Sequence, residues 1–379
     1  QTNEQADLDS VSEWLDDVVS GKGKKLTGEE YTTEYTKPYL PGSDFSVLEG
    51  TTLANGLVVR DGAGNEYVWV EVPTSIYDNE TYNTETETGD KKPANKEETN
   101  KIEYCLKKYT SLYSQSGFSD EYIEDSTPGW FADKTAYDNA KNTMLKSVYE
   151  NGGFYVGRYE AGIAENRTSE GPTNSDEKYT IEGMLTPVSK ADAYPYTYVT
   201  RTQAQNLASN VNSGTKTSSL MFGVQWDLVL AFMSKDTAEI TLTSHSTTIG
   251  NYSDSTFQLS QTGQYAVYSN YSLSSTWNPS TTSTTNFVDS SRNKIAQSSN
   301  GNGILVTTGT SEKNKVMNIY DIAGNVWEWT LEKPSNASNP CVIRGSGYDY
   351  DGSSYPAATR LSFTTTDANG DFGFRLSLW

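Results

Sequence analysis

The sequence predicts an α+β fold with long insertions. Two β-branched runs, residues 57–59 and 67–72, flank the glycine-rich segment 61–65, which is the pattern of a hairpin. Residues 134–150 and 219–234 instead carry apolar side chains at helical spacing. Because strand and helix patterns occur in one chain of 379 residues, a mixed fold of one large or two medium domains is expected.

The N-terminal part is expected to form one helix and a connector. Apolar side chains recur at helical spacing over residues 3–19, and Pro38 and Pro41 interrupt the extended segment that follows. The helix either docks on the body of the protein or attaches the chain to a larger assembly. We therefore divide the chain into residues 1–45, helix and connector, and residues 46–379, the main domain.

Two insertions are expected in this domain, at about 74–150 and 241–313. The first opens with the polar stretch 74–100, whose Thr and Glu alternate without an apolar face, so a surface loop is predicted. Helices over 101–113 and 134–150 follow. The second insertion is rich in Ser, Thr, Asn and Gly and is predicted to be a long loop, which is unusual unless it is functional.

Between the insertions, the pattern predicts a strand over 154–160 and helices over 200–212 and 219–234. Thr200 is a suitable N-cap, and Gln203 follows at the spacing of a capping box. The helix over 219–234 is the most apolar stretch of the chain. We expect it to lie in the core.

Composition excludes several classes of function. The net charge of −20 repels phosphate backbones, so nucleic-acid binding is not expected. No run approaches the roughly 18 apolar residues of a membrane span, so no membrane-spanning segment is expected in this chain. His245 is the single histidine, and Cys105 and Cys341 are the two cysteines, which excludes zinc sites built from several His or Cys ligands. The cysteines either stay free in the core or pair with each other. The many Tyr, Thr and Asn residues favour an extracellular setting.

The C-terminal part carries a family signature. Residues 318–330, NIYDIAGNVWEWT, resemble the signature segment of the formylglycine-generating-enzyme (sulfatase-modifying factor) family. Residues 344–348 resemble that family's Arg-Gly-Gly-Ser-Tyr step, Arg360 and residues 373–375 complete the pattern, and residues 157–161 match an upstream strand. The resemblance implies a C-type-lectin-like fold, with small twisted sheets, two helices and much loop.

The signature also predicts a rigid frame. Trp327 and Trp329 alternate along the chain, so both rings point to one face and anchor the core. Gly324 permits a backbone conformation that is closed to other residues. Arg344 and Arg375 are expected to be buried and to clamp carboxylates or carbonyl groups.

The chemistry of the family's enzymes is not expected here. The resemblance implies that the oxidases need two cysteines near the C-terminal motifs, but only Cys341 lies there. Iron-dependent sulfoxide synthases of similar fold need a histidine cluster, but His245 is alone in a Ser/Thr-rich loop. We therefore predict that the chain is not an enzyme.

A second branch of this fold binds ligands instead. It comprises the variable proteins of diversity-generating retroelements, whose C-terminal segment presents a rewritten binding surface on a fixed frame. Residues 348–371 resemble such a segment, because they contain two runs dense in Tyr, Asp, Ser and Thr. The alternative is that these runs are ordinary polar loops. The predicted ligand-binding residues are Tyr348, Asp349, Tyr350, Ser353, Ser354, Tyr355, Thr364, Asp367, Asn369 and Asp371.

The signature segment is also a candidate calcium site. In the calcium-binding members of the family, an acidic or amide side chain, two backbone carbonyls and a Glu surround the ion. The matching positions are Asp321, Gly324, Val326 and Glu328, whose oxygen ligands suit Ca²⁺ rather than Zn²⁺. The alternative is that Glu328 pairs with a buried arginine and no ion binds.

These observations predict a non-enzymatic, surface-displayed adhesin or receptor-binding protein, diversified at residues 348–371. It would sit on a cell surface or a phage virion and bind a protein or glycan receptor on another cell or surface. Two alternatives stay open: a diverged enzyme of the formylglycine-generating type, and a structural subunit of a pilus or a phage tail.

Overall fold

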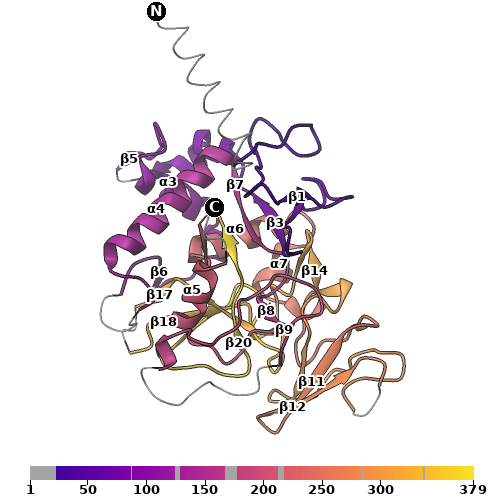
Figure 1. Cartoon of the computed structure of the whole chain (residues 1–379). Helices are drawn as coiled ribbons and strands as arrows, with labels where there is room; N and C mark the ends of the chain where they lie inside the picture. The colour runs from indigo at the N-terminus through magenta and orange to yellow at the C-terminus, as the bar shows by residue number, and fades with distance from the viewer. Residues whose placement is uncertain are drawn as a thin grey trace, which may run out of the picture.

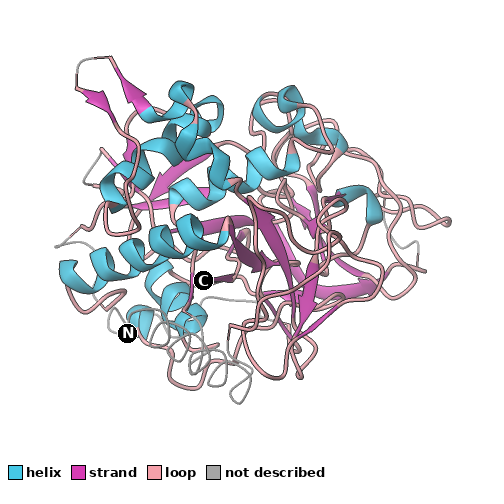
Figure 2. Cartoon of the chain, turned by 90° about the horizontal axis from the view of Figure 1, so that it is seen from above, coloured by secondary structure: helices cyan, strands magenta, loops and turns pink. Residues whose placement is uncertain are grey.

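The computed structural model describes residues 23–86, 88–123, 129–166, 177–211, 217–282, 286–335 and 338–379. The helix expected over residues 3–19 lies outside the described residues. None of the described helices has the length and the apolar character that a membrane crossing requires. The fold is α+β, as the sequence predicts, with the strands through the middle of the molecule and helices packed beside them (Figures 1 and 2).

The largest sheet brings the two ends of the domain together. Its order is β1 (Ser46–Val47), β2 (Val58–Arg60), β3 (Glu66–Glu71), β7 (Gly153–Gly157), β21 (Ser377–Leu378) and β10 (Ser218–Ser219). The predicted hairpin is confirmed, because β2 and β3 pair antiparallel with Val58 opposite Val68. The C-terminal strand β21 lies between β7 and β10, so the end of the chain is fixed in the central sheet.

A second sheet carries the signature segment. Its order is β19 (Arg360–Phe363), β18 (Cys341–Arg344), β16 (Trp327–Thr330) and β20 (Phe372–Gly373). The pair β16–β20 is parallel and the other two pairs are antiparallel. Strand β16 is therefore held on both sides, by β18 and β20. The residues predicted as the ligand-binding surface lie in the connections β18–β19 and β19–β20.

The described helices are α2 (Glu80–Asn83), α3 (Thr99–Tyr109), α4 (Lys134–Asn151), α5 (Arg201–Ser209), α6 (Gly223–Met233) and α7 (Glu239–Thr243). Helices α3 to α6 form from the predicted segments, whereas the short helices α2 and α7 were not predicted. Thr200 and Gln203 form the predicted capping box at the start of α5. Every residue of α6 is buried, which confirms it as a core helix. Helix α4 ends at Gly152, which adopts the left-handed conformation with φ +67°.

Short elements complete the chain. The two-stranded pairs are β14 (Lys315–Val316) with β15 (Ile319–Tyr320), β6 (Phe118–Ser119) with β17 (Lys333–Pro334), β4 (Thr84–Glu85) with β5 (Gly89–Asp90), and β8 (Gly162–Ile163) with β9 (Tyr194–Pro195). The 3₁₀ helices are η1 (Thr74–Asp78), η2 (Ser111–Tyr113), η3 (Glu177–Tyr179), η4 (Ser246–Thr248) and η5 (Glu312–Asn314).

Both insertions are more regular than their composition predicts. The stretch 74–100 contains η1, α2 and the β4–β5 pair rather than a plain loop. The stretch 241–313 contains a three-stranded sheet in the order β12 (Ser272–Pro279), β11 (Gln264–Ser269) and β13 (Gly303–Val306). Buried side chains such as Tyr265 and Ile304 give this sheet a small core of its own. In Figure 1 the β11–β12 hairpin projects at the opposite end of the molecule from α3 and α4.

The signature residues form the frame that the sequence predicts. Trp327 and Trp329 are each 1 % exposed, and the Trp329 ring meets Phe372 of β20 edge-on, with ring centres 5.3 Å apart. Gly324 has φ +71°, and a Cβ at this position would lie 2.2 Å from the carbonyl oxygen of Asn251. A side chain is therefore excluded by both conformation and space.

Candidate functional site: a tyrosine–aspartate cavity

The two predicted polar runs meet at one cavity of about 460 Å³, which we call the tyrosine–aspartate cavity. Half of the lining comes from the β18–β19 and β19–β20 connections, with three residues from each. These residues are Tyr348, Asp349, Tyr350, Asn369, Gly370 and Asp371. Five of the ten residues predicted from the sequence therefore lie around one hollow.

The other half of the lining comes from residues that sequence reasoning missed. They are Tyr198, Tyr268, Tyr271, Leu273, Asn300 and Gly301. Tyr271 stands at the turn of the β11–β12 hairpin, where Asn270 and Tyr271 both have positive φ, and it is 80 % exposed. Two such residues between strand-like runs are a weak hairpin signal, because the usual Asn-Gly or Asp-Gly pair is absent.

Backbone hydrogen bonds hold the cavity to the frame. Tyr348 donates its amide to the Asn325 carbonyl at 3.0 Å, inside the signature segment. Trp327 donates its amide to the Asp371 carbonyl at 2.7 Å. Gly301 donates its amide to the Asp349 carbonyl at 3.0 Å, which ties the insertion to the β18–β19 connection. The lining is therefore built on hydrogen-bonded backbone rather than on free loops.

Within the described residues, the two carboxyl groups of the cavity form no ion pair with a cationic side chain. Asp349 is 7 % exposed, and its Oδ1 atom accepts no hydrogen bond. Burial raises the pKa of Asp349 to about 6. Burial and then the nearby charge of Asp349 raise the pKa of Asp371 to about 8. Both shifts disfavour the charged form, since an unpaired anion loses its hydration when it is buried.

Three tyrosines of the predicted surface are partly or fully buried. Tyr348 lines the cavity but is fully buried, with its ring edge-on to Tyr268 at 5.3 Å between ring centres. Tyr350 and Tyr355 are half-buried, their ring centres lie 4.7 Å apart, and both rings contact Trp327. The sequence could not reveal this packing, because it depends on side chains brought together from separate strands.

The remaining predicted residues lie elsewhere. Ser353 and Ser354 are exposed and line a separate, shallow groove next to η2 and α7. Asp367 folds back on its own turn, where its Oδ2 accepts hydrogen bonds from the Thr364 amide at 2.7 Å and hydroxyl at 2.9 Å. The predicted surface is therefore divided among a cavity, a groove and a turn.

The side chains of the two candidate calcium ligands Asp321 and Glu328 accept hydrogen bonds from within the protein. Both carboxylate oxygens of Glu328 accept hydrogen bonds from Arg375, at 2.7–3.1 Å. Asp321 accepts from the Gly309 amide at 3.0 Å, and the amide of Gly324 is bonded to Gly345. Among the described residues, no three His, Cys, Asp or Glu side chains form a group suited to a metal ion. Glu328 thus follows the alternative stated above, in which it pairs with a buried arginine.

Other buried carboxylates of the frame are paired in the same way. Arg344 and Arg360 both contact Asp227, at 2.8 and 2.6 Å, and both contact Glu332, at 3.0 and 2.8 Å. All four side chains are nearly or fully buried. The predicted role of Arg344 and Arg375 as buried clamps is confirmed, and Arg360 is a third clamp.

The two cysteines and the histidine, the residue types that the family's chemistry uses, lie away from the tyrosine–aspartate cavity. Cys105 lies in α3 and Cys341 in β18, and both are buried. Burial raises the pKa of the Cys105 thiol to about 11, which disfavours its reactive thiolate. His245 is exposed beside η4. None of the three lines the tyrosine–aspartate cavity.

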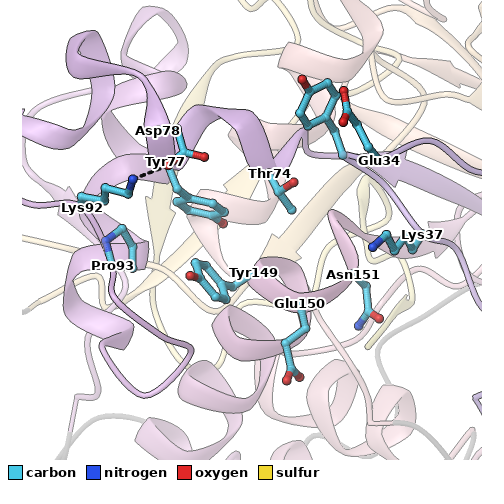
Figure 3. A pocket seen from close by; sticks show the side chains of 11 residues that line it. Glu34, Lys37, Thr74, Tyr77, Asp78, Lys92, Pro93, Tyr149, Glu150 and Asn151 are labelled. Carbon is cyan, nitrogen blue, oxygen red and sulfur yellow. Dashed lines mark ion pairs between the residues drawn. The ribbon is translucent and has the colours of Figure 1, made fainter.

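A second enclosed cavity, of about 330 Å³, lies at the other end of the chain, between η1, α4 and the connector (Figure 3). Tyr77 and Tyr149 lie next to each other in its lining, with tilted rings whose centres are 4.9 Å apart. Several of its charged side chains are paired: Lys92 forms an ion pair with Asp78 (Figure 3), and Glu150 forms one with Lys96. No residue predicted as functional lines this connector cavity.

The C-terminal part of the chain matches a known protein family. Residues 260–378 match the model of the sulfatase-modifying factor enzyme 1-like domain. No curated protein sequence matches the chain.

Solved structures of similar fold include PvdO from Pseudomonas aeruginosa, with 13 % identity, TM-score 0.32, and 60 % of this chain and 81 % of that chain covered. CarF has 15 % identity, TM-score 0.32, and coverage of 59 % and 85 %. Treponema denticola variable protein 1 has 11 % identity, TM-score 0.25, and coverage of 94 % and 92 %. At such scores the likenesses carry no functional argument. The family match at residues 260–378 confirms that the C-terminal part of this chain resembles the sulfatase-modifying factor family, and the structure is α+β as the signature implies.

Proposed function

We propose that this protein is a non-enzymatic binding protein displayed on a cell surface or a phage virion, and that its ligand enters the tyrosine–aspartate cavity. The observation that carries the proposal is the lining of this cavity. Five tyrosines and two aspartates surround it, on a backbone that is hydrogen-bonded to the frame. Tyrosine offers a large rigid contact area at a small entropic cost, which is typical of binding surfaces.

The proposal includes diversification of the lining, as in variable proteins of diversity-generating retroelements. Asp349, Tyr350, Asn369 and Asp371 are held through backbone hydrogen bonds, so their side chains can change while the frame stays. Tyr348 is excluded from this set because it is buried against Tyr268. A template repeat that matches the codons of this region, next to a reverse transcriptase gene, would support diversification, and its absence from the source genome would count against it.

The binding role is tested by a screen of protein and glycan receptors, followed by alanine substitution at the lining. We expect Tyr350, Asn369 and Asp371 to alter binding, whereas Ser353 and Ser354 in the separate groove serve as matched controls. Contacts that map only to the groove or to the connector cavity would contradict the proposed site.

The competing enzymatic function is tested directly. We expect no oxidation of a Cys-containing sulfatase peptide, with or without copper, because Cys105 and Cys341 are buried and lie outside the cavity. Turnover that persists in the Cys341→Ala variant would show that chemistry takes place at an unrecognised site.

A further inference from the structure

Asp349 and Asp371 bring two carboxyl groups to a place where the described part of the protein supplies no positive charge. No lysine, arginine or histidine among the described residues forms an ion pair with either of them. Asp349 lines the cavity and is more than nine-tenths buried, and its buried Oδ1 atom has no hydrogen-bond donor. A buried polar group without a partner is costly, so this arrangement points to a partner that comes from outside.

The rest of the lining suits a cation. Tyr268 and Tyr271 from the β11–β12 hairpin and Tyr198 and Tyr350 from the body line the same hollow. The faces of aromatic rings attract ammonium and guanidinium groups, and cages of such rings are a common means of recognising them. The volume of about 460 Å³ is within the range of small-ligand sites.

We infer that the tyrosine–aspartate cavity binds an organic cation, an ammonium or guanidinium group, between the carboxylates of Asp349 and Asp371 and the surrounding tyrosine rings. The inference rests on the proposed function and names its ligand class. A neutral ligand would leave both carboxylates unpaired, and an anionic one would meet two like charges and a net charge of −20. A bare calcium ion fits less well, since it takes about six to eight oxygen ligands and most of this lining is aromatic.

The test is calorimetric titration of the full chain with n-butylammonium and, as matched probes of the same length, neutral n-butanol and anionic butyrate. The pH is set above the pKa of about 8 of Asp371, so that both carboxyl groups can ionise. We expect saturable binding of n-butylammonium only. Asp349→Asn and Asp371→Asn should each weaken it by about tenfold or more, because a hydrogen bond to a charged group is lost. Asp236→Asn, which removes the same formal charge at an exposed position, should have no effect.

Equal binding of butanol and butylammonium, or binding that survives both asparagine variants, would overturn the inference. Calcium binding that is lost in the same two variants would also overturn it, in favour of a metal site. The thermal unfolding of each variant is recorded, and because asparagine has nearly the shape of aspartate, loss of binding with normal unfolding reports on charge.

The source of the cation is distinguished by a lysine-containing peptide and its lysine-acetylated counterpart. Preference for the unmodified peptide over free butylammonium indicates a protein receptor, and the reverse order indicates a small amine. The inference and the proposed function can fail separately. A receptor that contacts the cavity equally well after acetylation of its lysines and neutralisation of its arginines leaves the function standing without the cation. Amine binding without any macromolecular partner would support the cation site and contradict the proposed receptor-binding function.

Discussion

In the frame of this protein Glu328 faces the guanidinium of Arg375, whereas in the cavity Asp349 and Asp371 face tyrosine rings. Glu328 and Asp349 are buried and Asp371 is half-buried; Glu328 lies within the signature segment, and the two aspartates follow it. In the frame the partner is supplied by the chain itself, and the carboxylate has a structural role. In the cavity no partner is supplied, so the free energy of an unpaired charge is available to a ligand. The presence of a cationic partner therefore distinguishes the structural carboxylate of the frame from the carboxyl groups of the cavity, although all are acidic side chains.

The largest effect should follow from breaking the frame pair. Arg375→Met leaves Glu328 as an uncompensated charge in the core, and we expect a loss of about 3–5 kcal/mol in the free energy of unfolding. The double variant Arg375→Met with Glu328→Gln should recover part of this loss, because the unpaired charge is gone. Chemical denaturation of both variants measures the difference. If the single variant unfolded like the wild type, Glu328 would have another partner, and the contrast with the cavity would fail.

An intermediate effect, on ligand affinity, is expected from truncation of Tyr271, the exposed tyrosine of the tyrosine–aspartate cavity. Tyr271 is 80 % exposed at the tip of the β11–β12 hairpin, so Tyr271→Ala should change stability by less than about 0.5 kcal/mol. The same variant should cost about 1–3 kcal/mol of affinity for whatever ligand the cavity takes, as truncation of an aromatic anchor does. Tyr35→Ala, exposed beside the connector cavity, is a matched control that should leave affinity unchanged.

A smaller effect, of opposite sign to that in the frame, is expected on removing a cavity charge. The pKa of Asp371 is raised to about 8 in the folded state, so the stability it contributes is complete below its unfolded pKa and is lost as pH rises through about 8. Asp371→Asn should therefore stabilise the ligand-free protein above that pH. The expected gain in the free energy of unfolding is about 1 kcal/mol, less than the free energy that corresponds to a shift of one pKa unit.

The same substitution should have little effect on stability near pH 4, where the wild-type carboxyl group is already protonated in the folded state. Melting temperatures at the two pH values measure the difference. Destabilisation by Asp371→Asn at high pH would mean that the carboxylate has an unrecognised cationic partner, and it would remove the distinction between frame and cavity.

The smallest effect is expected from calcium. Because Arg375 already satisfies both oxygens of Glu328, a chelator should leave the melting temperature unchanged. A lower melting temperature in chelator, abolished by Asp321→Ala, would restore the predicted site at Asp321, Gly324, Val326 and Glu328. In that case the frame carboxylates would serve a ligand as well, and pairing would not separate the two roles.

Local sequence patterns determined much of this protein. The β2–β3 hairpin, helices α3 to α6 and the capping box of α5 follow from periodicity and turn chemistry, which act over a few neighbouring residues. The signature segment with Trp327 and Trp329 fixed the family resemblance and the frame. Residues 349–350 and 369–371 were recognised as candidate binding residues because Tyr and Asp are dense there.

Only the tertiary structure decided which of these residues form a site. Arg375 neutralises Glu328 from 47 positions away, and the tyrosines of the β11–β12 hairpin complete a cavity begun by the β18–β19 connection. Tyr348 is buried by its contact with Tyr268, although its neighbours in sequence are polar. These outcomes depend on contacts between segments far apart in the chain, and burial and charge pairing are set by such contacts, which no local period or spacing encodes.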